Sequence, residues 1–144
     1  MKNPQTLAMN LNKKFPNEKL NTIGKKACCA FVLMWCLGIE PDDADAIMLV
    51  DDLMKHGGVD KNCTVYWADA IKLLTGRTIK KIDFTKITSI SDIKGRTPVL
   101  YKKKPTDETG HWVGIENGAI IFNPLSYSEC VLYGKPVEKR VIYF

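Results

Sequence analysis

The sequence predicts an α+β fold in which a helical N-terminal half packs on a C-terminal antiparallel sheet. Up to residue 76, the longer segments have apolar residues at helical spacing and end near glycine or proline. After residue 76, shorter segments rich in β-branched and aromatic residues replace them. Asn117-Gly118 lies between two of these segments, which is the strongest short-range indication of a β-hairpin and favours antiparallel pairing.

The first two helices are expected at about Gln5–Lys14, broken by Phe15-Pro16, and at Gly24–Leu37. The second segment is apolar on all sides, so its periodicity fits a buried helix and a buried strand equally well. Its length and the Gly38 that follows it favour a helix, since glycine is common just past a helix end.

The next helix opens at Pro41-Asp42-Asp43, with proline in its first turn and acidic residues at the positive end of the helix dipole, and ends at His56-Gly57-Gly58. A further helix runs from Thr64 to Leu74 and stops at Gly76. Five strands are expected after it, at Thr78–Phe84, Pro98–Lys102, Trp112–Glu116, Ala119–Phe122 and Val137–Tyr143.

The composition is that of an ordinary globular protein, and its 144 residues predict a single domain over residues 1–144. The net charge of +5 comes from lysines scattered in pairs and triplets. This pattern indicates a solvated surface and argues against nucleic-acid binding, which needs clustered basic residues with interleaved aromatics. A mild attraction to anionic substrates stays open.

The N-terminal residues lack the apolar core of a secretion signal, and the longest apolar run, residues 27–37, is shorter than the ~20 residues that span a bilayer. The five cysteines are an odd number, which indicates reduced thiols. We therefore expect a cytoplasmic protein without a membrane partner.

Cys28 and Cys29 are the first candidates for chemistry, because they lie at the polar start of the apolar segment. The first turn of a buried helix favours a thiolate, and the preceding Lys25 and Lys26 are expected to lower the thiol pKa further. The alternative is that both cysteines are core residues, since free cysteine is among the most buried residue types.

His111 opens a predicted strand and Asn123 ends the next one. Paired residues of a two-stranded ladder lie about 4.5–5.5 Å apart, so a turn at Asn117-Gly118 brings Asn123 close enough to bond the imidazole. Such a bond fixes the tautomer and aims the other ring nitrogen at a thiol. The alternative is that Asn123 is only a turn residue before Pro124. The other histidine, His56, is predicted to be a surface cap at a helix end.

No metal-binding spacing, phosphate-binding loop or dinucleotide fingerprint is present, so we expect neither a metal nor a cofactor.

Three segments together resemble the compact papain-like cysteine peptidases, which include the bacteriocin-leader (double-glycine) and NlpC-type peptidases. Cys28-Cys29-Ala30-Phe31 is similar to the Cys-Trp-Ala-Phe of papain and the Cys-Ser-Gly-Phe of the NlpC group. The strand that starts at His111 resembles the His-(aromatic)-Val-Val-Ile strand of the bacteriocin-leader peptidases. Asn123-Pro124 resembles their Asp-Pro, with asparagine here as in papain. The resemblance covers about residues 22–125.

The resemblance implies a papain-like fold in which Cys28 attacks an amide carbonyl, His111 exchanges the proton and Asn123 orients His111. The spacing to Ala30 and Phe31 favours Cys28 as the nucleophile, while Cys29 stays open. Papain-like enzymes carry an oxyanion-hole glutamine six residues before the nucleophile.

In this chain position 22 is Thr22 and the one glutamine is Gln5. Asn21 or a backbone N–H would have to take the place of the missing donor. Losing one oxyanion donor typically costs 10²–10³-fold in turnover.

We therefore expect a cysteine hydrolase acting on amide or peptide bonds, with a peptide or peptidoglycan-peptide substrate. The alternative is a catalytically inactive papain-fold module that binds a partner or serves as a scaffold, which the missing glutamine favours. A third possibility is a small protein whose thiols are only structural. The substrate, the pathway and the oligomeric state are not determined by the sequence.

Overall fold

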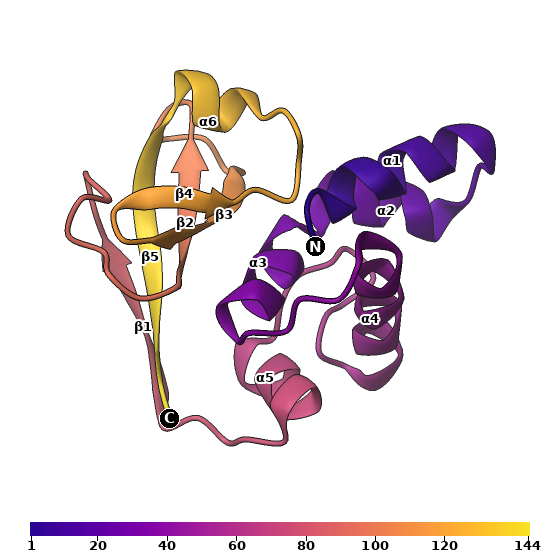
Figure 1. Cartoon of the computed structure of the whole chain (residues 1–144), viewed down its shortest axis with the longest axis horizontal. Helices are drawn as coiled ribbons and strands as arrows, with labels where there is room; N and C mark the ends of the chain where they lie inside the picture. The colour runs from indigo at the N-terminus through magenta and orange to yellow at the C-terminus, as the bar shows by residue number, and fades with distance from the viewer.

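The computed structural model describes residues 1–144 and has the predicted α+β architecture. Five helices come first, and they lie on one side of the sheet with α3 nearest to it (Figure 1). They are α1 (Pro4–Lys14), α2 (Glu18–Lys26), α3 (Cys28–Cys36), α4 (Asp43–His56) and α5 (Trp67–Thr75). The strands are β1 (Lys81–Lys86), β2 (Thr97–Lys102), β3 (His111–Glu116), β4 (Ala119–Phe122) and β5 (Lys135–Tyr143), with the short helix α6 (Glu129–Tyr133) before β5.

The five strands form one antiparallel sheet in the order β1-β5-β2-β3-β4. The hairpin between β3 and β4 turns at Asn117 and Gly118, whose φ angles of 51° and 74° are both positive, as a type I′ turn requires. A bulge between Gly114 and Ile115 shifts the register, so Gly114 faces Phe122. Each predicted strand is present with slightly different ends, whereas the sequence gives no indication of α6.

The segment predicted as one helix from Gly24 to Leu37 is two helices in the structure. The chain turns at Ala27 (φ −88°, ψ 13°), where α2 ends and α3 begins. The sequence does not predict α2, which starts at the Asn17 side chain accepting a hydrogen bond from Leu20 N (3.2 Å). Lys25 and Lys26 therefore occupy the last turn of α2, where cations interact favourably with the helix dipole, and they do not precede the first turn of the cysteine helix directly as a loop would.

Two other helix starts differ from the prediction. Asp42 caps α4 by accepting from Asp45 N (2.8 Å), so Pro41 lies just outside the helix. Thr64 belongs to a loop in which its N–H donates to Asp60 Oδ1 (3.0 Å), and α5 begins only at Trp67. Both differences are local, because a side-chain hydrogen bond competes with the first helical turn.

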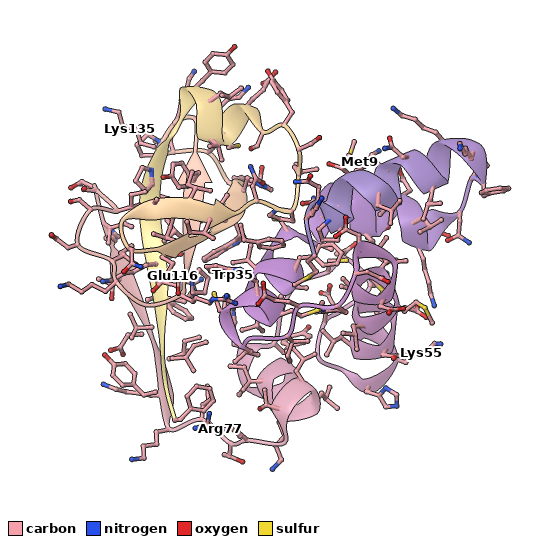
Figure 2. The ribbon with its side chains drawn as sticks, viewed as in Figure 1. Met9, Trp35, Lys55, Arg77, Glu116 and Lys135 are labelled. Atoms are coloured by element: carbon pink, nitrogen blue, oxygen red, sulfur yellow. The ribbon has the colours of Figure 1, made fainter.

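Helix α3 is buried on nearly all sides, as its uniform apolarity predicts. It lies in the centre of the main hydrophobic cluster of 18 buried residues, between the other helices and the sheet. Its Trp35 stacks on Phe122 of β4 (ring centroids 6.0 Å apart) and lies between α3 and the sheet, beside Glu116 (Figure 2). With nine residues α3 is short, and none of the helices is both long and apolar enough to cross a membrane.

Gly114 provides the space for this packing. A Cβ at position 114 would lie under 3.0 Å from two ring atoms of Trp35, closer than real Cβ atoms approach. We expect Gly114→Ala to lower the free energy of unfolding by about 1–3 kcal/mol, because an overpacked core forces side chains and backbone to shift. Chemical denaturation measures this, with Gly95→Ala as the control, since a Cβ at Gly95 meets nothing within 4 Å. Equal stabilities of the two variants would contradict the prediction.

Candidate functional site

The structure brings His111 and Asn123 together at the end of the β3–β4 hairpin. The His111 Nε2 and Asn123 Oδ1 atoms are 2.7 Å apart, and the histidine is buried. His111 is the first residue of β3, and Asn123 directly follows β4. The hydrogen bond expected from the hairpin is therefore present, although the bulge has shifted the register by one residue.

The tautomer of His111 follows from the other contact of Asn123. Asn123 Oδ1 also accepts a hydrogen bond from Leu125 N (3.1 Å), which identifies this atom as the amide oxygen. Because an oxygen acceptor faces His111 Nε2, that nitrogen carries the proton and donates it. In the neutral imidazole Nδ1 then carries a lone pair, and Nδ1 has no hydrogen-bond partner in the structure.

Cys28 is the first residue of α3 and lies near the start of β3. Its thiol is influenced by the backbone N–H of Trp112, the residue after His111, and by the backbone N–H groups of Cys29 and Cys28 itself. No hydrogen bond joins the thiol to the imidazole. The structure thus places the cysteine and histidine segments side by side without a direct bond between the two side chains.

Burial raises the pKa of the Cys28 thiol above its ordinary value, and the nearby backbone N–H groups only partly oppose this. Lys25 and Lys26 do not contribute to this pKa, and the expectation that they lower it is wrong. The cause is the helix break at Ala27, which leaves both lysines exposed on α2. Burial likewise lowers the pKa of His111, and the bond to Asn123 raises it less. The two groups are therefore a neutral thiol and a neutral imidazole at pH 7.

The start of α1 is tied to the chain around Asn123. Pro124 O accepts from Gln5 N (3.0 Å), and Asn123 O accepts from Asn3 Nδ2 (2.9 Å). Gln5 is 1% exposed, and its Oε1 is buried without a hydrogen-bond partner. Buried polar atoms without partners are rare in proteins, so this side-chain amide is a candidate for a functional role.

Helix α1, which carries Gln5, packs on α2 and also contacts α3. Asn12 Nδ2 donates to Asn21 Oδ1 (3.4 Å), and Met9 packs on Gly24. Gln5 lies one turn before Met9 on the same face of α1. Gln5 is thus a buried amide on the face of α1 that packs on the helices, beside the segment that follows Asn123.

Access to this site is restricted. Cys28 and His111 are 8% and 5% exposed, so only a small part of either residue is accessible to a substrate. A surface hollow between α2 and α4 is lined by none of the candidate residues.

The remaining cysteines and the second histidine have other surroundings. All five cysteines are free, and burial raises the pKa of Cys29 well above its usual range and that of Cys63 to about 12. His56 is exposed and its Nδ1 lies 2.9 Å from Asp52 O, which is the surface cap that the sequence predicts. No three His, Cys, Asp or Glu side chains are grouped so that they could hold a metal ion.

In comparisons with known proteins, no protein-family model, curated protein or solved structure matches the chain.

The lowered pKa of His111 predicts how stability depends on pH. Below about pH 6.5, the usual pKa of histidine, the unfolded chain binds a proton that the folded protein does not. We therefore expect the free energy of unfolding to fall as the pH decreases from 6.5, by at most about 1.4 kcal/mol per pH unit. Denaturation at about pH 7 and pH 5 measures this, a window above the range in which acidic groups titrate.

His111→Gln is expected to reduce this pH dependence, whereas the control His56→Gln, at an exposed site, retains it. The same slope in wild type and His111→Gln would contradict the prediction. An NMR titration of the His111 ring protons gives the pKa directly, with a midpoint expected below about 6.5.

Proposed function

We propose that this protein is a cysteine hydrolase that cleaves an amide bond by acyl transfer, with Cys28 as nucleophile, His111 as general base and Asn123 as the residue that positions His111. The observation that carries the proposal is the 2.7 Å hydrogen bond between His111 Nε2 and Asn123 Oδ1. It leaves Nδ1 as a proton acceptor at the start of β3, the strand end that adjoins the cysteine. The papain-like fold and the peptide or peptidoglycan-peptide substrate that the sequence resemblance implies are part of this proposal.

The first half of the reaction starts from neutral groups. The Cys28 sulfur attacks the carbonyl carbon while its proton passes to His111 Nδ1, which forms an imidazolium held by the Asn123 oxygen. The C–N bond then breaks, and the imidazolium returns the proton to the leaving amine. Binding of a substrate would exclude water from a site that is already buried, which strengthens the hydrogen bonds to the developing charge.

The second half releases the acyl group. Water attacks the Cys28 thioester, His111 Nδ1 accepts its proton, and collapse of the intermediate returns this proton to the sulfur and frees a carboxylic acid. In both halves the carbonyl oxygen becomes negative. The backbone N–H of Cys28 and the Gln5 side-chain amide are the donors that we assign to this oxyanion.

Cys28 fits the nucleophile better than Cys29. The Cys28 thiol is influenced by the Trp112 backbone N–H next to His111, whereas Cys29 is influenced by Arg140 and Cys36. The five free thiols also suit a reducing compartment, and we propose the cytoplasm as the location.

A binding or scaffold module is the second candidate. It is favoured by the closed site, in which Cys28 and His111 are buried and the thiol pKa is raised. In this case the three polar residues stabilise the hairpin end and no thioester forms.

Acylation by p-nitrophenyl acetate separates the two functions without knowledge of the natural substrate. For a hydrolase we expect acetylation of Cys28 in preference to Cys36 and Cys63, read site by site by mass spectrometry. His111→Ala is expected to abolish this preference, because the thiol loses its base. Cys29→Ser is the matched control and retains it. Equal modification of all cysteines, or none, would favour the binding module.

The role of Gln5 has a separate test. We expect Gln5→Ala to lower the rate of Cys28 acetylation by about 10²–10³-fold, the usual effect of losing one oxyanion donor. Thr6→Ala is the neighbouring control, since Thr6 also ties α1 to the segment after Asn123, through Ser126, but Thr6 is only half-buried. Equal effects of the two substitutions would show that Gln5 only holds α1 in place.

A further inference from the structure

Arg140 lies in an aromatic site near the start of α3, where its charge lowers the pKa of Cys29, the residue after the candidate nucleophile. It projects from β5, and its guanidinium carbon is 3.6 Å from the ring centroid of Phe84, its cross-strand neighbour on β1. The rings of Trp112 and Trp67 form the other walls, 5.1 Å and 5.7 Å from the guanidinium carbon. These two rings contact each other edge to face. We call these four residues the Arg140 site.

The guanidinium has buried N–H groups that make no aligned hydrogen bond within the protein. The side chain is only 13% exposed, and Nε and Nη1 are buried without a hydrogen-bond partner. Glu138 Oε2 is 2.5 Å from Nη1, an ion-pair contact without the alignment of a hydrogen bond. A buried cation with unused donors is unfavourable unless an acceptor arrives.

The other two arginines of the chain do not combine burial with N–H groups that lack hydrogen bonds. Arg96 stacks on Trp35 but also donates to Trp35 O (2.8 Å) and to Glu40 (3.0 Å). Arg77 stacks on Phe144 at 3.7 Å, and it is exposed, so that water satisfies its donors. Arg140 is the arginine that combines stacking, burial and unpaired N–H groups.

We infer that Arg140 binds a carboxylate of the substrate beside Cys28. The planar guanidinium matches a carboxylate with two parallel hydrogen bonds, and the aromatic walls strengthen the attraction by excluding water. The site adjoins the chemistry through Trp112, which follows His111 and whose backbone N–H acts on the Cys28 thiol. This inference deepens the proposed function and rests on it: the amide that is cleaved carries a nearby carboxylate.

The approach of an anion is consistent with the rest of the molecule. The net charge of +5 favours anionic ligands over cationic ones. Phe84 is 61% exposed, so the outer wall of the site faces solvent and can move to admit a ligand. The carboxylate could be an acidic side chain or a free chain end, and the two differ in where the rest of the peptide extends.

The test measures binding on the Cys28→Ser protein, which cannot form a thioester. Three small probes differ only in their charges: N-acetylglutamate α-amide has the side-chain carboxylate, N-acetylglutamine has the terminal carboxylate, and N-acetylglutamine amide has neither. NMR signals of the indole N–H groups report binding, with Trp67 and Trp112 in the site and Trp35 outside it. We expect saturable shifts of Trp67 and Trp112 with at least one carboxylate and none with the neutral amide. The probe that binds identifies the source of the carboxylate.

Substitutions then assign the binding to Arg140. In the same background, Arg140→Met is expected to weaken binding at least tenfold, and Arg140→Lys severalfold, because lysine keeps the charge but loses the planar pair of donors. Glu138→Gln is expected to tighten binding by removing a competing carboxylate. Arg77→Met is the matched control, because Arg77 stacks on Phe144 and is not part of the Arg140 site, and it leaves binding unchanged. If Arg140→Met does not fold, Arg140→Lys and Glu138→Gln still test whether carboxylate binding depends on Arg140.

The inference is overturned if neither carboxylate binds at millimolar concentration, or if binding is the same in wild-type and Arg140 variants. Failure of the proposed function is a different result. Carboxylate binding without Cys28 acetylation would leave a binding module that recognises carboxylates, whereas acetylation without carboxylate binding would leave a hydrolase with another specificity.

Discussion

The packing of Trp35 against Gly114 is the contact on which the arrangement of the two halves depends. Because Gly114 lacks a side chain, the indole of α3 reaches the backbone of β3 and stacks on Phe122 of the neighbouring strand. Arg96 covers the other side of the indole and binds the carbonyl of Trp35. This fixes α3 against β3, and with it the distance between the helix end that carries Cys28 and the strand end that carries His111.

A second set of contacts fixes the polar residues around that junction. The start of α1 binds the backbone of Asn123 and Pro124, while Asn123 itself binds His111 and Leu125. The orientation of the imidazole is thus set by the hairpin, and the hairpin end is held by the first helix. Residues more than 100 positions apart in the chain are thus held together here, through the hydrogen bonds of Asn3 to Asn123 and of Gln5 to Pro124.

Burial shifts the pKa values of the two candidate groups in opposite directions, and both shifts favour the neutral form. It keeps the Cys28 thiol protonated and the His111 imidazole neutral. In the proposed reaction, the charged pair would form only when the thiol proton moves to the imidazole. Arg140 is ion-paired with Glu138 on its own strand, and its Nε is buried without a hydrogen-bond partner. The proposed recognition of a carboxylate depends on this incompletely bonded guanidinium.

The sequence by itself determined the fold class, the five strands, the Asn117-Gly118 turn and the His111–Asn123 hydrogen bond, because periodicity and turn chemistry act over a few residues. The break at Ala27, the raised thiol pKa and the neighbourhood of Gln5 were decided only by the tertiary structure. The pKa depends on burial by distant segments, and the place of Gln5 depends on the hydrogen bonds between the start of α1 and the segment around Asn123. Arg140 carries no sequence signal at all, since Phe84, Trp67 and Trp112 meet around it from three separate elements.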